Sequence, residues 1–303
     1  MLRKRIFLIS SVQTAIVALI LILPGTLPAD QLQVFVSILP QKYFVQQIGM
    51  DLVNVQVMVQ PGTSPATYEP KPSQMTDLAT ARIYFSIGVP FESIWLKKIT
   101  ASNQTLMVVP TDHGIAKLTM AEHHHFESEA LPESKKDHHH NGLTDPHIWT
   151  SPPLVMMQAR TILIALQACD PANRDFYETN YKHFINDLVD LDDELRQLLA
   201  DQKGASFLVF HPSWGYFADA YGLQQIAIEI EGKDPKPAQL QELIGHAKEK
   251  KIKAVFVQSQ FSSKNADVIA KAIGGQVIAA DPLAADWTAN LRRQALQFKA
   301  ALR

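Results

Sequence analysis

The sequence predicts an α/β protein made of two parallel-sheet lobes of the (βα)4 type, joined by one long rigid helix, with a cleft between the lobes. Two observations support this fold class. Short apolar, β-branched segments alternate with helical patterns in two separate stretches of the chain, and a long amphipathic segment lies between those stretches. Strands that alternate with helices are typical of parallel sheets, because parallel neighbours require a crossover connection.

Residues 1–29 have the order of a secretory signal peptide. A basic stretch at residues 3–5 precedes an apolar run over residues 6–23, and the small residue Ala29 precedes the expected cleavage site. An uncleaved membrane anchor is the alternative, because the apolar run is close to the lower limit for a membrane span. In both cases the rest of the chain is exported. The single cysteine, Cys169, allows no intrachain disulfide and lies too far along the chain for lipid attachment, so we expect a periplasmic protein.

Residues 30–169 are predicted to form the N-terminal lobe, with helices between its strands at residues such as 41–48 and 72–81. The expected strands are residues 34–39, 53–59, 83–87 and 106–109. A histidine-rich segment at residues 122–140 interrupts this lobe, and its charged and polar composition predicts an exposed loop. Its histidines are His123, His124, His125, His138, His139 and His140.

Residues 170–203 are predicted to form the linking helix. Asp170 suits the N-cap and Pro171 suits the first turn, and neither glycine nor proline interrupts the segment from there to about residue 201. Apolar residues recur at spacings of three and four, which predicts an amphipathic helix of roughly 30 residues and about 45 Å. A coiled-coil partner helix is the competing interpretation. A single rigid rod between two lobes would limit hinge bending.

Residues 204–303 repeat the strand and helix alternation and are predicted to form the C-terminal lobe. The expected strands are residues 207–210, 225–230, 254–257 and 277–280, and the expected helices are residues 237–250, 263–273 and 287–302. The chain as a whole is 47% hydrophobic and 19% charged with a net charge of −2, so nothing in its composition indicates nucleic-acid binding.

Three side chains are expected to converge on one crevice, because ligands of open parallel sheets bind outside the carboxyl ends of the strands. His211 and Asp281 each follow a predicted strand directly, and each is followed by proline. His147 comes at the end of the first lobe in the segment Asp145-Pro146-His147-Ile148-Trp149, where the proline restrains the backbone. Imidazole nitrogen with carboxylate oxygen suits a divalent metal, most simply Zn2+. Taken singly, a histidine or an Asp-Pro pair at a strand end is more often structural.

Four segments resemble, in order and over essentially the whole mature chain, the motifs of the periplasmic metal-binding proteins of zinc and manganese ABC importers. These segments are residues 60–70, 145–149, 211–217 and 281–283. The resemblance implies two lobes bridged by a rigid helix, a metal in the cleft, and delivery to a cognate ABC permease in the inner membrane. His211 and the histidine-rich segment resemble the zinc branch more than the manganese branch. We therefore expect a monomeric binding protein, not an enzyme, that takes Zn2+ in preference to Mn2+.

One departure from the family pattern concerns the first motif, where members usually carry a ligand histidine and this chain has Ala66. Alanine has no donor atom, which leaves His147, His211 and Asp281 as the expected ligands. Water, a histidine of the segment 122–140, or an exogenous ligand such as a chelator could complete the site. An open coordination position is also how catalytic zinc sites are built, so a zinc hydrolase is a further alternative. Its nearest base, Glu69, fits a structural role in its turn better.

The remaining histidines support no second ligand group in the sequence. His113, His183 and His246 lack a partner at a spacing that suggests a ligand, so we expect them to be ordinary surface or helix residues. The six histidines of the segment 122–140 are predicted either to form only a solvated insertion or to bind metal weakly as an auxiliary site.

Overall fold

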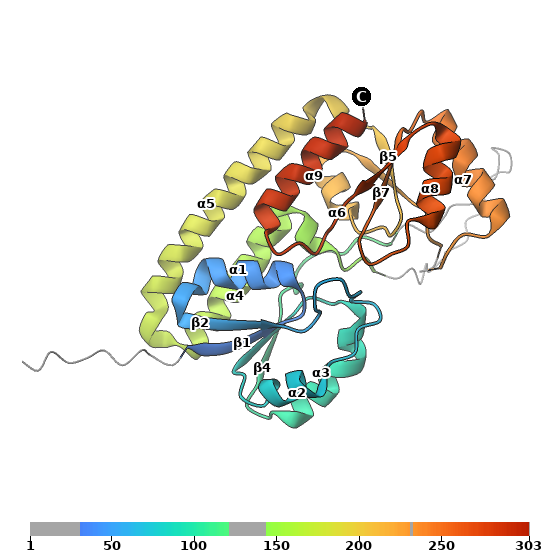
Figure 1. Cartoon of the computed structure of the whole chain (residues 1–303). Helices are drawn as coiled ribbons and strands as arrows, with labels where there is room; N and C mark the ends of the chain where they lie inside the picture. Colours follow the sequence, from blue (N-terminus) through green and yellow to red (C-terminus); the bar gives the residue numbers. More distant parts are fainter. Residues whose placement is uncertain (1–30, 121–143, 231–232, 303) are drawn as a thin grey trace, which may run out of the picture. The chain divides into compact units, whose positions relative to one another are not determined.

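The computed structural model describes residues 31–120, 144–230 and 233–302. The predicted signal peptide and the histidine-rich segment 122–140 lie outside these residues. Each half of the described chain contains a four-stranded, all-parallel sheet with helices around it (Figure 1), so the predicted α/β class with two parallel-sheet lobes is confirmed. No helix in the described ranges is long and apolar enough to cross a membrane.

The first sheet has the strand order β2-β1-β3-β4. Its strands are β1 (Leu32–Val36), β2 (Val53–Val57), β3 (Ile83–Ser86) and β4 (Met107–Pro110). Its helices are α1 (Leu39–Gly49), α2 (Pro72–Leu78), α3 (Pro90–Ser102) and α4 (Pro152–Cys169). All four predicted strands are present. The first of them ends earlier than predicted, because α1 begins at Leu39 with Pro40 in its first turn. Proline is favoured there, since its fixed φ suits a helix and its missing N–H would have no partner in that turn.

The second sheet repeats the same order as β6-β5-β7-β8. Its strands are β5 (Ser206–Val209), β6 (Gln224–Ala227), β7 (Ala254–Val257) and β8 (Gln276–Ala279). Its helices are α6 (Gly215–Tyr221), α7 (Pro237–Glu249), α8 (Lys264–Ile273) and α9 (Trp287–Ala301). The predicted strand over residues 225–230 is shorter in the structure, because β6 ends at Ala227.

The long helix between the sheets, α5, spans Arg174–Leu199 and begins later than predicted. Asp170 terminates α4, since its backbone N–H donates to the carbonyl of Leu166, and its carboxylate accepts a hydrogen bond from Tyr177. The chain therefore leaves Pro171 in a 3-10 turn, and a second such turn follows the helix at Ala200–Gln202. The α-helical part has 26 residues, about 39 Å, instead of the expected 30.

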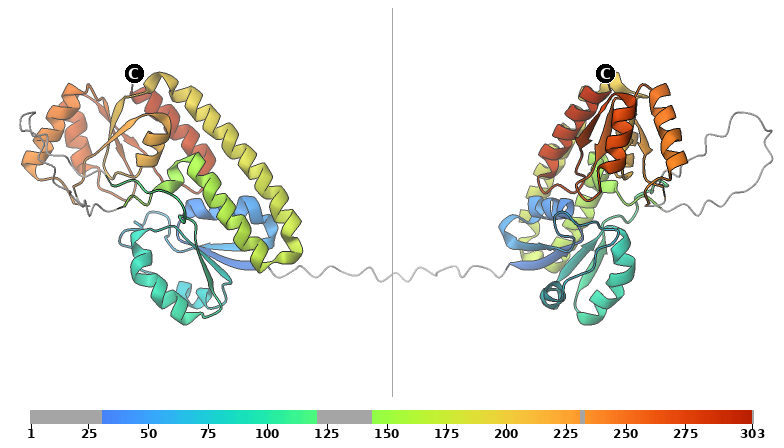
Figure 2. Two further views of the ribbon diagram at one scale, coloured as in Figure 1. Left: turned by 180° about the vertical axis from the view of Figure 1, so that it is seen from behind. Right: turned by 45° about the vertical axis from the view of Figure 1, so that its right-hand side comes forward.

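The apolar stripe of α5 is covered by helices of both lobes. α5 packs against α1 and α4 along one part of its length and against α9 along another, as the views of Figure 2 show. The buried residues of the stripe are Tyr177, Phe184, Leu188, Leu191, Leu195 and Leu199. Intrachain helices thus bury the surface that a separate coiled-coil partner would have covered. α4, which was not among the predicted helices, supplies much of this cover.

An aromatic cluster connects the two lobes beneath α5. The rings of Phe44 from α1 and Trp287 from α9 meet edge to face with centroids 5.0 Å apart, and Phe184 of α5 lies 6.1 Å from Phe44. All three side chains are buried. Aromatic pairs in this geometry stabilise a core by about 0.5–1.5 kcal/mol beyond the burial of their area. The contact between α1 and α9 thus joins the two lobes.

Candidate metal site

A cavity with a volume of about 120 Å³ lies between the carboxyl-end loops of the two sheets. Its walls come from both lobes: Ala66, His147 and Trp149 belong to the first lobe, and His211 and Phe261 belong to the second. The parallel topology explains this convergence, since the carboxyl ends of parallel strands meet at one edge of each sheet. The cavity therefore brings together two of the three predicted ligand residues.

His147 is held by its own turn. It directly precedes the 3-10 turn Ile148–Thr150, and only 8% of its surface is exposed. The Oδ1 atom of Asp145 accepts the backbone N–H of His147 at 2.9 Å and lies 2.6 Å from the imidazole Nδ1. Pro146 separates the two residues and fixes its own φ, so the backbone of the turn is restrained. The side chain that the sequence identified as well placed is thus oriented by the residue two positions before it.

Hydrogen bonds tie this turn to the second lobe. The indole N–H of Trp149 donates to the carbonyl of Pro282 at 2.8 Å, and the indole N–H of Trp287 donates to the carbonyl of Trp149 at 2.8 Å. The hydroxyl of Tyr216 donates to the carbonyl of Asp145 at 2.8 Å. Because these bonds are buried, they hold the His147 turn against the loop that follows β8 and against α6.

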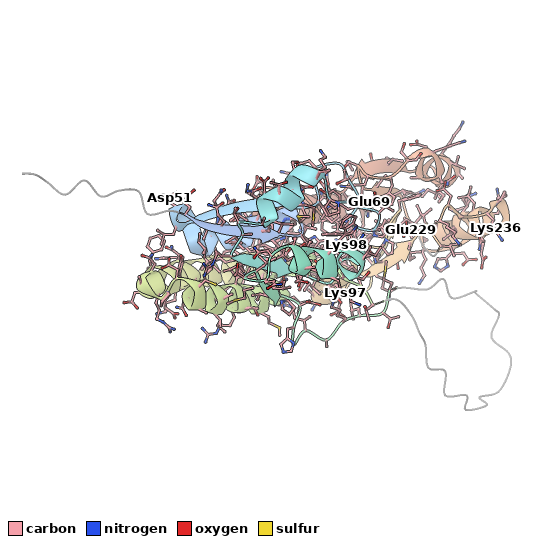
Figure 3. All side chains as sticks on the ribbon, turned by 90° about the horizontal axis from the view of Figure 1, so that it is seen from below. Asp51, Glu69, Lys97, Lys98, Glu229 and Lys236 are labelled. Atoms are coloured by element: carbon pink, nitrogen blue, oxygen red, sulfur yellow. The ribbon has the colours of Figure 1, made fainter. Side chains whose placement is uncertain are left out.

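His211 is held by three side chains of the second lobe. Its Nδ1 lies 2.6 Å from Oε1 of Glu229, which follows β6 and is labelled in Figure 3. The amide of Gln258 accepts the backbone N–H of His211 at 3.2 Å and donates to its carbonyl at 2.5 Å. The ring of Phe261 stacks on the imidazole with centroids 5.0 Å apart. Both the direction and the plane of the His211 ring are therefore set.

The Nε2 atoms of His147 and His211 face each other at 3.3 Å. An ionised carboxylate only accepts hydrogen bonds, so Asp145 and Glu229 place the proton of each ring on Nδ1. Both Nε2 atoms then carry lone pairs directed at the same space, an arrangement that a cation between them stabilises. Two nitrogen ligands at about 2.0–2.1 Å from a tetrahedral zinc ion are about 3.3–3.4 Å apart, so the pair matches one edge of such a site.

Burial lowers the pKa of His147 below its ordinary value of 6.5, and the electrostatic interaction with His211 lowers it further. The charge and hydrogen bond of Asp145 act in the opposite direction and raise this pKa. The lowering effect of burial is the larger of the two, so the imidazole is neutral at pH 7. A neutral imidazole is the form that binds a metal ion.

Asp281 follows β8 as the sequence predicts but lines a neighbouring hollow with Gln60, Pro61 and Gly62. Its Oδ1 atom accepts the backbone N–H of Leu283 at 2.9 Å. Across the described residues there is no group of three His, Cys, Asp or Glu side chains close enough to hold one metal ion. The structure thus brings His147 and His211 together, whereas Asp281 lines the neighbouring hollow and stays a predicted ligand.

The other described histidines lie apart from the cavity. His113 and His183 are exposed, and His246 is 3.9 Å from the carboxylate of Glu249 within α7. The structure agrees with the expectation that these are surface or helix residues. The six histidines of the segment 122–140 lie outside the described residues, so their predicted auxiliary role stays a prediction.

Sequence reasoning missed the part played by Glu229. The predicted strand over residues 225–230 placed this residue inside the sheet, whereas β6 ends at Ala227 and Glu229 follows it. The sequence did contain an indication of this role, because Glu229 is a charged residue near the end of a predicted strand. Asp281 was identified as a candidate on that ground, but Glu229 was not. Asp145 was recognised as part of the His147 turn, although not as the partner of the imidazole.

Comparison with known proteins identifies the family of this chain. Residues 34–301 match the family described as "Zinc-uptake complex component A periplasmic", ZnuA. The high-affinity zinc uptake system protein ZnuA of Bacillus subtilis is 29% identical over 251 residues, which cover 82% of this chain and 77% of the relative. The Yersinia pestis protein of the same name is 26% identical over 284 residues, which cover 89% of this chain and 88% of the relative.

Solved structures give the same result. A crystal structure of ZnuA is 42% identical to this chain and has a TM-score of 0.82. The match covers 90% of this chain and 100% of the chain in that structure. A zinc-bound structure of a ZnuA deletion mutant is also 42% identical, with a TM-score of 0.81 and coverage of 90% and 98%. Since the family match includes nearly all of the described residues, this chain belongs to the family of the periplasmic zinc-uptake component ZnuA.

Proposed function

We propose that this protein captures Zn2+ in the periplasm and delivers it to a cognate ABC permease in the inner membrane. The observation that carries the proposal is the pair of carboxylate-backed imidazoles, His147 and His211, with their Nε2 atoms 3.3 Å apart. Membership of the zinc-uptake family supports the same cargo. The family consists of substrate-binding proteins of zinc transporters and not of enzymes, in agreement with the expectation of a binding protein rather than a zinc hydrolase.

The charge around the imidazole pair favours a divalent cation. Asp145 and Glu229 place two carboxylates directly behind the rings, and their two negative charges balance the charge of Zn2+. The carboxylates also raise the basicity of the rings and fix their orientation, so binding requires little side-chain rearrangement. Imidazole ligands suit zinc better than manganese, which prefers oxygen donors. We therefore propose Zn2+ as the cargo in preference to Mn2+.

Asp281 is proposed as a third ligand. It lies at the carboxyl end of β8, and Leu283, two residues later, lines both the histidine cavity and the hollow beside Asp281. A carboxylate oxygen would complete a donor set of two nitrogens and one oxygen, which is common in zinc sites with one open position. If Asp281 is a ligand, Asp281→Asn weakens zinc binding. If it only caps its own turn, this substitution leaves zinc affinity unchanged.

The test of the proposed function is native mass spectrometry combined with metal analysis, on protein purified without added metal and without an affinity tag. We expect one zinc per chain, lost in His147→Ala and in His211→Ala. The control is His183→Ala, which removes an exposed imidazole from α5 and is expected to retain the zinc. Absence of zinc from the wild-type protein under zinc-replete conditions would contradict the proposal.

The segment 122–140 is proposed as an auxiliary capture site. Several imidazoles in a polar stretch bind divalent metal weakly and raise its concentration near the main site. Deletion of residues 122–140 is expected to remove weak zinc equivalents from a titration and to leave the tight equivalent unchanged. Loss of the tight equivalent as well would identify a histidine of this segment as a ligand of the main site.

A further inference from the structure

The cavity in front of His147 and His211 is larger than a metal ion requires. Its volume is about 120 Å³. A buried water molecule requires roughly 10–15 Å³ on the same measure, so one water at an open coordination position would fill only a small part of the space. A ligand of several heavy atoms fits there together with the metal.

The walls of this cavity are mostly apolar. The side chains of Ala66, Val89, Phe261 and Leu283 line it, together with four prolines. Buried water is stable where it finds two to four polar partners, and such walls provide few of them. Concave apolar surfaces with a small number of polar groups are typical of sites for small organic ligands.

The lack of charged side chains among the described lining residues restricts what such a ligand can be. Within the described part of the chain, none of the side chains that line it is Lys, Arg, Asp, Glu or Cys. A polyanionic chelator would therefore find no cationic side chain among these lining residues. A ligand with a single carboxylate is neutralised by the metal itself. Ser64, Thr144 and Gln260 also line the cavity and offer hydrogen bonds to a carboxylate oxygen or an amine.

The protein leaves coordination positions free for such a ligand. The two imidazoles supply two donors and Asp281, if it turns toward the metal, supplies a third. Ala66 also lines the cavity and has no donor atom. Zinc with three protein ligands accepts one further donor and expands to five-coordination. Ala66 and Val89 line the same cavity as the two imidazoles, so a molecule that binds the metal there lies against apolar side chains.

We propose that this protein binds its metal together with a small α-amino acid that has an apolar side chain. The amine nitrogen and one carboxylate oxygen of the amino acid bind the metal as a chelate, and the side chain lies against Ala66, Val89 and Leu283. This inference rests on the proposed function, because the metal is bound first by His147 and His211. It names the cargo as a metal–amino acid complex in place of a bare ion.

The experiment is native mass spectrometry of metal-free wild-type protein with zinc held at a fixed free concentration by a metal buffer, in the presence of L-leucine or of glycine. We expect a complex of one protein, one zinc and one leucine. The apparent zinc affinity is expected to rise at least about tenfold more with leucine than with glycine, since glycine lacks the groups that fill the apolar space. Zinc binding that neither retains leucine nor responds to it would overturn the inference and leave the proposed function intact.

Two variants of Ala66 test the placement of the ligand. Ala66 is exposed, so we expect both variants to fold. Ala66→His supplies an imidazole in place of the amino acid, so we expect tight zinc binding without retained leucine. Ala66→Leu fills the apolar space and supplies no donor, so we expect zinc binding with a loss of leucine retention. Equal retention of leucine by both variants and the wild type would contradict the placement of the ligand. Failure of the wild type to bind zinc under every condition would instead overturn the proposed function.

Discussion

The Nε2 atoms of His147 and His211 lie 3.3 Å apart, although the two residues are 64 positions apart in the chain and belong to different lobes. Each ring is turned into this position by a carboxylate 2.6 Å from its Nδ1, Asp145 in the first lobe and Glu229 in the second. Two nitrogen atoms at this distance match one edge of a tetrahedral zinc site. The carboxylates are therefore as important to the proposed activity as the histidines.

Replacement of Glu229 by glutamine is expected to weaken zinc binding by about 10- to 100-fold, which is the usual cost of losing a carboxylate behind a metal-binding histidine. The amide can still accept the Nδ1–H hydrogen bond, but it does not raise the basicity of the ring or balance the charge of the metal. Zinc affinity measured by competition with a chromophoric chelator tests this. Asp193→Asn removes an exposed carboxylate from α5 and is the matched control. Equal affinities of the two variants would contradict the role assigned to Glu229.

Acidification is expected to release zinc. Protonation of His147 adds to this release only when the pH falls to the lowered pKa of its ring. Burial moves this pKa below 6.5, so at pH 7 and above the ring is neutral and zinc displaces no proton from it. As the pH falls through the lowered pKa, protons compete for Nε2 and affinity decreases. Asp145 raises the pKa of His147, so in Asp145→Asn the ring should titrate at a lower pH than in the wild type. NMR titration of the metal-free proteins measures this shift, and a shift to higher pH would contradict the interpretation.

The buried Glu92 is expected to make the stability of the metal-free protein fall between pH 5 and pH 8. Burial raises its pKa from 4.5 to about 7, although Ser37 and the backbone N–H groups of Ile87 and Gly88 donate to its carboxyl oxygens. Because the folded-state pKa lies above the unfolded one, its stabilising contribution is complete below pH 4.5 and is lost as the pH rises through 7. A difference of this size corresponds to roughly 3 kcal/mol.

Glu92→Gln is the comparison that isolates this residue. The neutral amide does not ionise, so the difference in free energy of unfolding between variant and wild type should change by up to that amount between pH 5 and pH 8. Denaturant titrations at several pH values measure it. A constant difference across this range would show that Glu92 does not titrate there.

Loss of the hydrogen bond between Trp287 and the carbonyl of Trp149 is expected to destabilise the fold. Trp287→Phe keeps an aromatic ring in the buried position but leaves that carbonyl without its donor, which costs about 1–3 kcal/mol. Chemical denaturation of the metal-free protein measures the change. Trp95→Phe is the control, because Trp95 is only partly buried and the ammonium group of Lys98 lies over its ring. Equal losses in the two variants would contradict a specific role for the bond.

The sequence by itself predicted the two sheets, the long helix and two histidines that the structure brings together in one cavity. Strand periodicity and the end of a strand are local properties, so the apolar segments identified all eight strands of the described residues and placed His211 after β5. Pro146 marked the turn that carries His147. The helix α5 was predicted about one turn too long, because Asp170 caps the end of α4 through contacts that the local pattern does not contain.

Only the tertiary structure decided how these residues face one another. Glu229 reaches His211 because β6 ends two residues before it, and a boundary error of a few residues hid it inside a predicted strand. Asp281 follows its strand as expected, yet its carboxylate accepts a hydrogen bond from its own turn and lines a separate hollow. Side-chain direction depends on hydrogen bonds between segments far apart in the chain and on how two lobes pack through α5 and α9. Those interactions leave no periodic pattern in the sequence, so only the tertiary structure shows them.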